Sequence, residues 1–275
     1  MTIDNVTAVY FSPTGNTEKM CTQIAQELAK KLRVPCRHVN FTLPAARTRR
    51  HVFTGTSLVV FAMPTYAGRL PNKLVPFVQK NFQGLQSPAI TLVTFGNRSA
   101  DSALPELAQT LAQNGFYVIA GASLAAPHVF SPRIGNTRPD AADMHLQEDF
   151  IRALANKLRP QLPLTEVPRP SLLSAPIAPY YTPLGIDGKP AKFLKAKPQT
   201  NLPACTRCLR CVNACPMGSI NPEDPSQVPG ICIKCHACIH ICPHHAKYFA
   251  DTAFLSHVAM LEQNYTRRAK NHYYL

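Results

Sequence analysis

Apolar runs and amphipathic repeats alternate along the first 160 residues. Five short apolar runs are predicted as strands: 6–11, 35–39, 57–63, 90–95 and 116–120. The segments between them carry apolar residues every three or four positions and are predicted as helices: 17–32, 70–82, 100–114 and 140–158. Strands and helices that alternate in this way build an α/β, doubly wound sheet of parallel strands.

The pattern changes after this region. Residues 160–200 hold nine of the 26 prolines, and proline at this density removes backbone donors and blocks helices. The sequence therefore predicts four parts: an α/β domain at 1–160, an extended connector at 161–200, a cysteine-rich domain at 201–250 and a tail at 251–275. The tail begins with a helical pattern and ends in basic and aromatic residues.

Eight of the ten cysteines form two copies of the motif C-x2-C-x2-C-x3-C-P, with corresponding cysteines 27 residues apart. An iron–sulfur cluster needs four thiolates from a short, sharply turning segment, as this motif provides. Four disulfides are typical of small secreted chains, and the N-terminal residues have no signal-peptide pattern. Zinc sites use cysteine pairs set well apart. The motif therefore predicts two iron–sulfur clusters.

Residues 202–249 resemble the bacterial two-cluster ferredoxins, which have a small α+β fold. In that family the fourth cysteine of each run binds the other cluster. The resemblance implies two 4Fe-4S clusters, and it implies that the metal is the main support of this domain. Ser219 and Lys247 depart from the small and apolar residues usual after each Cys-Pro. The implied ligand sets are Cys205, Cys208, Cys211 and Cys242 for the first cluster, and Cys232, Cys235, Cys238 and Cys215 for the second.

The first predicted strand runs through the polar loop Ser-Pro-Thr-Gly-Asn-Thr, residues 12–17, into a helix. Backbone N–H groups and the positive end of the helix dipole then face whatever lies above the loop. The loop is neither a Walker A motif nor a G-x-G-x-x-G fingerprint. An ordinary helix cap accounts for only one or two of its hydroxyls. We therefore predict a phosphate site made of neutral donors.

Two further loops follow the third and fourth predicted strands, where ligands bind in open α/β sheets. Each loop alone is compatible with an ordinary turn. Arg69 and Arg98 flank the expected pocket, either as contacts to a ligand or partner or as solvated side chains. The loop residues are Pro64, Thr65, Tyr66, Ala67 and Gly68, and Phe95, Gly96, Asn97 and Arg98.

Residues 12–17 match the phosphate loop of flavodoxins, T/S-x-T-G-N-T. This resemblance implies a flavodoxin-like sheet with strand order 2-1-3-4-5 and a bound flavin mononucleotide (FMN). Tyr66 is then expected to stack on the flavin ring, and the Ala67–Gly68 peptide to face its N5 edge. The implied phosphate contacts are Ser12, Thr14, Gly15, Asn16 and Thr17, and the two further loops are the implied ring contacts.

Four histidines interleave with the second cysteine run: His236, His240, His244 and His245. A Rieske centre replaces two cysteines with histidines, whereas all eight cysteines are present here. We expect the histidines beside a cluster or at the surface. An N–H donated to a cluster sulfur would raise that cluster's potential.

Composition narrows the choice of partners. The chain carries a formal net charge of +14 with scattered basic residues, which favours redox proteins with acidic docking surfaces and not nucleic acid. The longest apolar run, 58–63, is too short to span a membrane. The expected location is the cytoplasm, where thiols stay reduced.

Together these features resemble the flavodoxin–ferredoxin fusion proteins of bacteria. The resemblance implies an electron-transfer protein that passes electrons between FMN and two 4Fe-4S clusters and onward to redox partners. Two alternatives stay open: a flavin-dependent reductase of a small quinone-like molecule fed by the clusters, and an iron–sulfur redox sensor. No acid–base pair or triad stands out, so we predict no catalytic residues.

Overall fold

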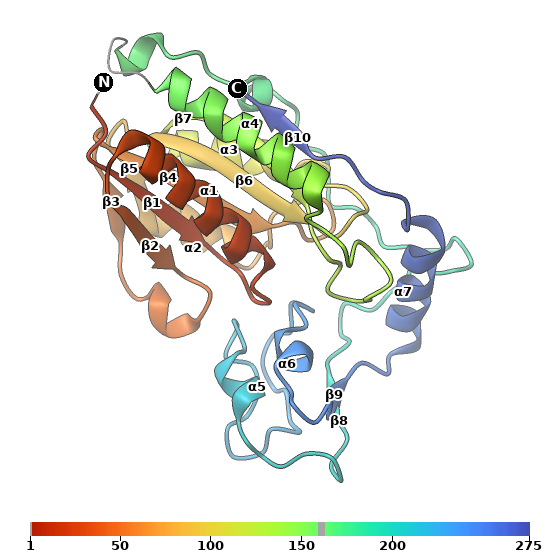
Figure 1. Cartoon of the computed structure of the whole chain (residues 1–275). Helices are drawn as coiled ribbons and strands as arrows, with labels where there is room; N and C mark the ends of the chain where they lie inside the picture. The colour runs from red at the N-terminus through yellow and green to blue at the C-terminus, as the bar shows by residue number, and fades with distance from the viewer. Residues whose placement is uncertain (1, 159–162) are drawn as a thin grey trace.

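A six-stranded sheet forms the centre of the larger part of the molecule (Figure 1). The computed structural model describes residues 2–158 and 163–275. The strand order is β10-β7-β6-β4-β1-β2, with five parallel strands and β10 antiparallel at the edge. The strands are β1 (Asn5–Tyr10), β2 (Cys36–Asn40), β4 (Ser57–Pro64), β6 (Pro88–Phe95), β7 (Tyr117–Ala125) and β10 (His272–Tyr274).

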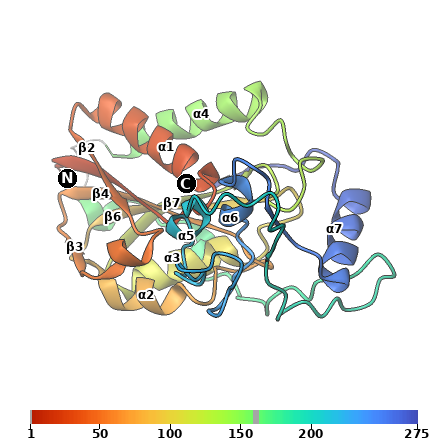
Figure 2. The same cartoon turned by 90° about the horizontal axis from the view of Figure 1, so that it is seen from below.

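Helices cover both faces of this sheet, as Figures 1 and 2 show. Helices α1 and α4 lie on one face, and α2 and α3 lie on the other. The central strands β4 and β6 are therefore buried on both sides, which explains why their sequences are nearly continuous apolar runs. These helices are α1 (Asn16–Leu32), α2 (Val75–Asn81), α3 (Ala103–Gln113) and α4 (Ala141–Lys157).

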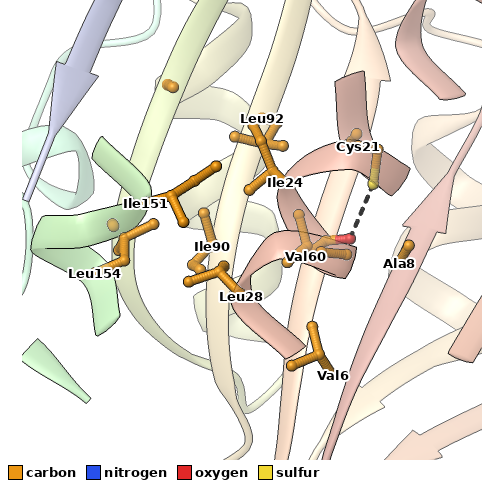
Figure 3. Packing of buried hydrophobic residues seen from close by; sticks show 14 of the residues in the cluster. Val6, Ala8, Cys21, Ile24, Leu28, Val60, Ile90, Leu92, Ile151 and Leu154 are labelled. Carbon is orange, nitrogen blue, oxygen red and sulfur yellow. Dashed lines mark hydrogen bonds between the residues drawn. The ribbon is translucent and has the colours of Figure 1, made fainter. Parts of the chain in front are cut away.

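The apolar face of α1 packs on the sheet as its periodicity predicts (Figure 3). Ile24 and Leu28 are fully buried against strand residues such as Val60. Cys21 lies on the same face, and its Sγ donates to the Val60 carbonyl at 3.3 Å. The two predictions, an amphipathic helix and a buried Cys21, are confirmed.

The helix predicted at 70–82 is shorter than its pattern suggests. Leu70, Leu74 and Val78 are buried at helical spacing, but the α-helix begins only at Val75. Pro76 lacks an N–H and is tolerated only in the first turn of a helix, so the preceding residues form a turn instead. The strand predicted at 116–120 extends further, to Ala125.

Several short elements carry no strong sequence signal. Outside the six-stranded sheet, two short strand pairs have only two or three residues in each strand. The 3-10 turns η1 to η3 have three or four residues each. These elements are β3 (His51–Phe53), β5 (Phe82–Gly84), β8 (Gln199–Thr200), β9 (Lys247–Tyr248), η1 (Pro44–Arg47), η2 (Leu164–Glu166) and η3 (Ser171–Leu173). The cysteine-rich segment adds α5 (Arg210–Asn213) and α6 (Ala237–His240), and the tail adds α7 (Thr252–Asn264).

The connector lies along the α/β domain. Leu172 is buried on the sheet side of α3, and Gln109 of that helix donates to the carbonyls of Leu172 and Ala175. Tyr117 donates through its hydroxyl to the Val167 carbonyl at 3.0 Å. The predicted boundary between residues 160 and 161 lies outside the described residues. In the part of the chain that the structure describes, no helix has the length and apolarity needed to cross a bilayer.

One aromatic cluster joins four segments of the chain. Phe254 of α7 is buried, with ring centroids 4.9 Å from Phe130, 5.4 Å from Phe193 and 4.5 Å from Phe249. These rings come from the loop after β7, the connector and the cysteine-rich segment. His236 lies 5.0 Å from Phe249 with nearly parallel rings. We call these five residues the Phe254 cluster.

The tail returns to the α/β domain and completes its sheet. Strand β10 pairs with β7, so that Tyr273 lies opposite Ala122. Asn97 holds the preceding segment, because its side chain donates to the Tyr265 and Arg267 carbonyls and accepts from the Ala269 amide. The tail is therefore part of the first domain in space although it is last in sequence.

A buried ion pair secures the same segment. Arg138 and Asp143 have side chains only 2% exposed and form a two-bond contact. Arg138 also donates to the Ala269 carbonyl, while Asp143 accepts from Arg268 and Asn271. Asp143 thus balances two arginines at the start of α4.

We expect Asp143→Asn to lower the free energy of unfolding by about 3 kcal/mol, because it leaves the buried Arg138 charge with only the more distant Asp140 carboxylate, at 3.9 Å. Asp149→Asn on the same helix is the control: that side chain is 48% exposed, and its loss is expected to cost less than about 1 kcal/mol. Urea unfolding followed by circular dichroism compares the two. Equal stability of both variants would contradict the role given to the Asp143 carboxylate.

Candidate functional site

One cleft lies at the carboxyl ends of β1, β4 and β6, where the three predicted loops meet. It contains about 1130 Å³ of empty space, including its opening to solvent, which is ample for a ligand of nucleotide size. Of the predicted flavin contacts, eleven line it: Thr14, Asn16, Thr17, Pro64, Thr65, Tyr66, Ala67, Gly68, Phe95, Gly96 and Arg98. Ser12, Gly15 and Asn97 are the other three, and they shape the surrounding loops.

Hydrogen bonds of Ser12 and Thr17 hold the phosphate loop in place and leave the space at Gly15 open. Gly15 caps α1 with a positive φ of 88°, and the space where a Cβ would project is open. Ser12 Oγ accepts from the Glu18 amide at 3.0 Å, so this hydroxyl already caps the helix. Thr17 and Thr94 share a hydrogen bond between their hydroxyls at 2.7 Å. Thr14 remains half-buried on the cleft wall.

The second loop is a tight turn. Tyr66 and Arg69 exchange both backbone hydrogen bonds, and Ala67 and Gly68 have φ angles of 49° and 77°. A Cβ at residue 68 would clash with Asp101, so only glycine fits there. The Ala67 carbonyl accepts from the Tyr181 amide at 2.8 Å. The connector thus contacts the loop that was predicted to face the flavin ring.

The third loop contributes to the cleft through Phe95, Gly96 and Arg98. His128 packs so closely on Gly96 that a Cβ there would clash with its ring. Asn97 has a positive φ of 64° and is only 1% exposed, because its side chain turns toward the tail. The structure therefore places Asn97 behind the cleft wall, where it supports the loop.

Arg69 and Arg98, which the sequence left undecided, hold the connector. Arg69 forms two hydrogen bonds with Glu106 and lies 5.0 Å from the ring centre of Tyr180. Arg98 lies 4.0 Å above the ring of Tyr181. Stacking of a guanidinium on an aromatic face is favourable and orients both groups. Both arginines therefore fix chain segments at the rim of the cleft.

Segments from outside the α/β domain cover the cleft. Tyr181 and Phe193 come from the connector, and His257 comes from α7. No sequence motif marks these residues, so the sequence did not predict them as part of the cleft. Further covering residues are Pro183, Ile233, Lys234, Cys235 and Leu261.

The cysteine-rich segment with α5 and α6 lies below the sheet in Figure 1, and its residues Ile233 and Lys234 line the cleft. Cys235 lines the cleft together with Tyr66. Burial raises the pKa of Tyr66 well above its usual value, and ionised thiols at Cys235 and Cys232 raise it further. The predicted flavin loop and the second cysteine run therefore lie within electrostatic range of each other.

The eight cysteines surround two separate cavities. The outer cavity, of about 350 Å³, is lined by Cys205, Cys208, Cys211 and Cys242. The inner cavity, of about 370 Å³, is lined by Cys215, Cys232, Cys235 and Cys238. Each cavity thus receives three cysteines of one run and the last cysteine of the other, the same grouping as the ligand sets implied by the ferredoxin resemblance.

The two runs also share a backbone conformation. Positive φ angles of 54° and 58° at Arg207 and Leu209 recur as 55° and 61° at Lys234 and His236, 27 residues later in each case. Residues other than glycine adopt this conformation at a cost of about 1–2 kcal/mol each. Such strain persists where the surroundings enforce it, often at functional sites. The repeated turns lie among the first three cysteines of each run, which line one cavity.

Backbone amides point at the sulfur atoms that close each run. Ser219 donates to Cys215 Sγ at 3.3 Å, and Ala246 donates to Cys242 Sγ at 3.2 Å. The two residues that depart from the ferredoxin pattern are buried with polar partners: Ser219 donates to the Ile231 carbonyl, and Lys247 donates to the Pro225 carbonyl. Both substitutions are thus accommodated by the fold.

Unpaired polar atoms line all three cavities. In the described part of the chain, four buried side-chain nitrogen or oxygen atoms lack a hydrogen-bond partner. These atoms are Thr65 Oγ1, in a residue of the cleft wall, Thr200 Oγ1, in a residue of the outer cavity, His236 Nε2, in a residue of the inner cavity, and His51 Nε2. A buried polar atom without a partner costs about 1–3 kcal/mol. Three of these residues could therefore offer a hydrogen bond to a polar group bound in the cleft or in the cysteine cavities.

The four histidines near the second cysteine run lie in different surroundings: His236 beside the inner cavity, and the other three exposed. Burial lowers the pKa of His236 to about 3, so its ring is neutral beside the inner cavity. His240 contacts the Val129 carbonyl at 3.1 Å across the boundary between the two parts. His244 and His245 are exposed.

Solved structures that resemble part of the chain are flavodoxins and related proteins. A short-chain flavodoxin associated with a non-canonical PDU bacterial microcompartment is 14% identical with a TM-score of 0.40, covering 58% of this chain and 100% of that one. A Streptococcus pneumonia flavodoxin is 16% identical with a TM-score of 0.38, covering 56% and 99%. A flavodiiron core from Synechocystis is 19% identical with a TM-score of 0.38, covering 56% and 37%. No curated protein matches the chain.

Two family models match separate parts of the sequence. A flavodoxin domain matches residues 8–135, which include all three predicted flavin loops. A 4Fe-4S dicluster domain matches residues 204–247, which include all eight cysteines of the two runs. These domains imply FMN and two 4Fe-4S clusters as cofactors, and they support a role in electron transfer. The chain thus unites a flavodoxin domain and a 4Fe-4S dicluster ferredoxin domain, as in a flavodoxin–ferredoxin fusion protein.

Proposed function

We propose that this protein passes electrons between FMN in the cleft and redox partner proteins, by way of two 4Fe-4S clusters held in the inner and outer cavities. The eleven lining residues named above would hold the flavin, and the four cysteines of each cavity would bind one cluster. When bound, FMN exchanges two electrons and releases them singly, whereas each cluster carries one electron.

The observation that carries this proposal is the position of Cys235. This cysteine lines both the flavin cleft and the inner cavity. Cys238 of the inner cavity and Cys211 of the outer cavity pack in one apolar cluster with Ile220. The three cavities therefore form a series, with the inner cavity between the other two.

At the outer end of this proposed series, a cysteine reaches the surface. Cys208 of the outer cavity is exposed, and so are Arg207 and Leu209 beside it. Cys235 and Cys238 are buried, and the cleft is covered by the connector and α7. We infer that partner proteins exchange electrons at the outer cavity. The arginines there favour an acidic partner surface.

Anaerobically purified protein is expected to contain about eight irons per chain, since two 4Fe-4S clusters hold four each, and about one FMN. Metal analysis and the visible spectrum check both contents together. Zinc in place of iron would contradict the cluster assignment, and a chain that binds clusters but no flavin would contradict the cleft assignment.

Thr65→Val is expected to weaken FMN binding about fivefold, because a hydrogen bond to the unpaired hydroxyl contributes about 1 kcal/mol. Titration of flavin-free protein with FMN, followed by fluorescence quenching, measures the dissociation constant. Thr200→Val is the matched control, since it removes an equally unpaired hydroxyl from the outer cavity. An equal effect of both variants would show that Thr65 does not contact the flavin.

Arg210→Glu tests whether electrons are exchanged at the outer cavity, because Arg210 is exposed beside Cys208. We expect reduction by the dithionite anion to slow about threefold at low ionic strength and reduction by the methyl viologen cation to accelerate. Stopped-flow absorbance measures both rates. Arg152→Glu makes the same charge change on α4, away from the cysteines, and is expected to alter neither rate. If the two reduction rates changed in the same direction, electron exchange at the outer cavity would be contradicted.

A further inference from the structure

We propose that Arg47 couples the phosphate loop of the cleft to the inner cavity, and that its positive charge raises the reduction potential of the cluster bound there. The inference rests on the proposed function, since it assumes that FMN and the inner cluster share one chain. It assigns a positioning role to a residue that belongs to neither cofactor motif.

Arg47 ends the 3-10 turn η1, at the boundary between the flavodoxin and ferredoxin parts. Its Nη2 donates to the Thr42 carbonyl at 3.3 Å on the flavodoxin side. The same nitrogen donates to the Pro216 carbonyl on the ferredoxin side. Pro216 directly follows Cys215, which lines the inner cavity. One guanidinium therefore bridges the two parts next to a proposed cluster ligand.

The bond to Thr42 continues to the phosphate loop. The Ser12 amide donates to Thr42 Oγ1 at 2.8 Å, and both residues are buried. Ser12 in turn caps α1 through Glu18. Hydrogen bonds to different atoms of Thr42 and Ser12 thus link the start of α1, through these two residues and Arg47, with the backbone beside Cys215. Movement of Arg47 would disturb both ends of this series.

The surroundings keep Arg47 close to the cluster site. Pro44 of the same turn lies against Gly218, where a Cβ would be in ordinary contact at 3.6 Å. Burial lowers the pKa of Arg47, whereas an ionised thiol at Cys215 raises it. A guanidinium stays charged in proteins. Among the described residues, no acidic side chain pairs with Arg47, so its charge acts on the cysteine side without compensation.

This charge has a defined effect on redox chemistry. Reduction adds one negative charge to a cluster, and a nearby cation stabilises the more negative form. Hydrogen bonds and charges around cluster sulfurs set the potential in the same way. Lysine retains the charge of arginine but lacks the planar fork, whereas glutamine retains a donor and loses the charge. Substitutions at residue 47 can therefore separate the two roles.

The experiment is a potentiometric titration of cofactor-loaded protein, followed by electron paramagnetic resonance and visible absorbance. Arg47→Gln is expected to shift the inner-cluster equilibrium about tenfold toward the oxidised form, which corresponds to about 59 mV for one electron. The outer cluster should stay unchanged. Arg47→Lys should restore the inner potential. Arg49→Gln is the matched control, because Arg49 is exposed only two residues away and carries the same charge. Cys208→Ser identifies the outer-cluster signal by shifting it alone.

Hydrogen exchange gives a second readout that does not depend on redox activity. Arg47→Lys and Arg47→Gln should both speed exchange of the Ser12 amide, while Arg49→Gln should not. If residue 47 variants match the wild type in potential and in exchange, the proposal is overturned. A wild-type chain that loads no cluster or no flavin would instead overturn the proposed function, so the two failures are distinguishable.

Discussion

The arrangement of the whole molecule depends on the packing of Phe254 between rings from three other segments. Its partners come from the loop after β7, the connector and the cysteine-rich segment, while Phe254 itself belongs to the tail. Buried aromatic rings contribute large apolar areas and prefer defined relative orientations. This single cluster fixes the cysteine-rich segment against the edge of the sheet where the flavin loops lie. Hydrogen bonds from Arg47 to the Pro216 carbonyl and between His240 and the Val129 carbonyl add to this contact between the two parts.

The chain reinforces that contact at both ends of the cysteine-rich segment. Before it, Tyr180 and Tyr181 stack on Arg69 and Arg98 at the rim of the cleft. After it, β10 joins the sheet and the Arg138–Asp143 pair holds the preceding residues. Short tethers raise the effective concentration of one site near another. Anchoring both ends of the cysteine-rich segment also restricts the orientation of this segment. Cys235 therefore stays on the wall of the cleft.

Sequence periodicity predicted the elements whose signals are local. The helix at 17–32 and the strand at 57–63 were recognised because buried faces impose periods of 3.6 residues and continuous apolar runs. The motif spacing predicted two clusters, the resemblance to two-cluster ferredoxins implied which cysteines meet, and the loop 12–17 predicted where a phosphate is expected. The roles of Asn97 and Arg69 could not be predicted, since their partners lie far away in sequence, in the tail and the connector. The strand β10 escaped notice because three residues carry too little periodicity to mark an edge strand.

In the cysteine-rich segment, the free energy of metal binding has to offset backbone strain. Its apolar clusters are small, with Cys211, Ile220 and Cys238 as the buried members of one. Its turns place several residues other than glycine in left-handed conformations. A segment that buries so little apolar area cannot offset such strain by packing alone. Metal binding supplies free energy that is available only in the folded form. The sheet domain has its own large core and does not depend on metal binding in this way, whereas the cysteine-rich segment does.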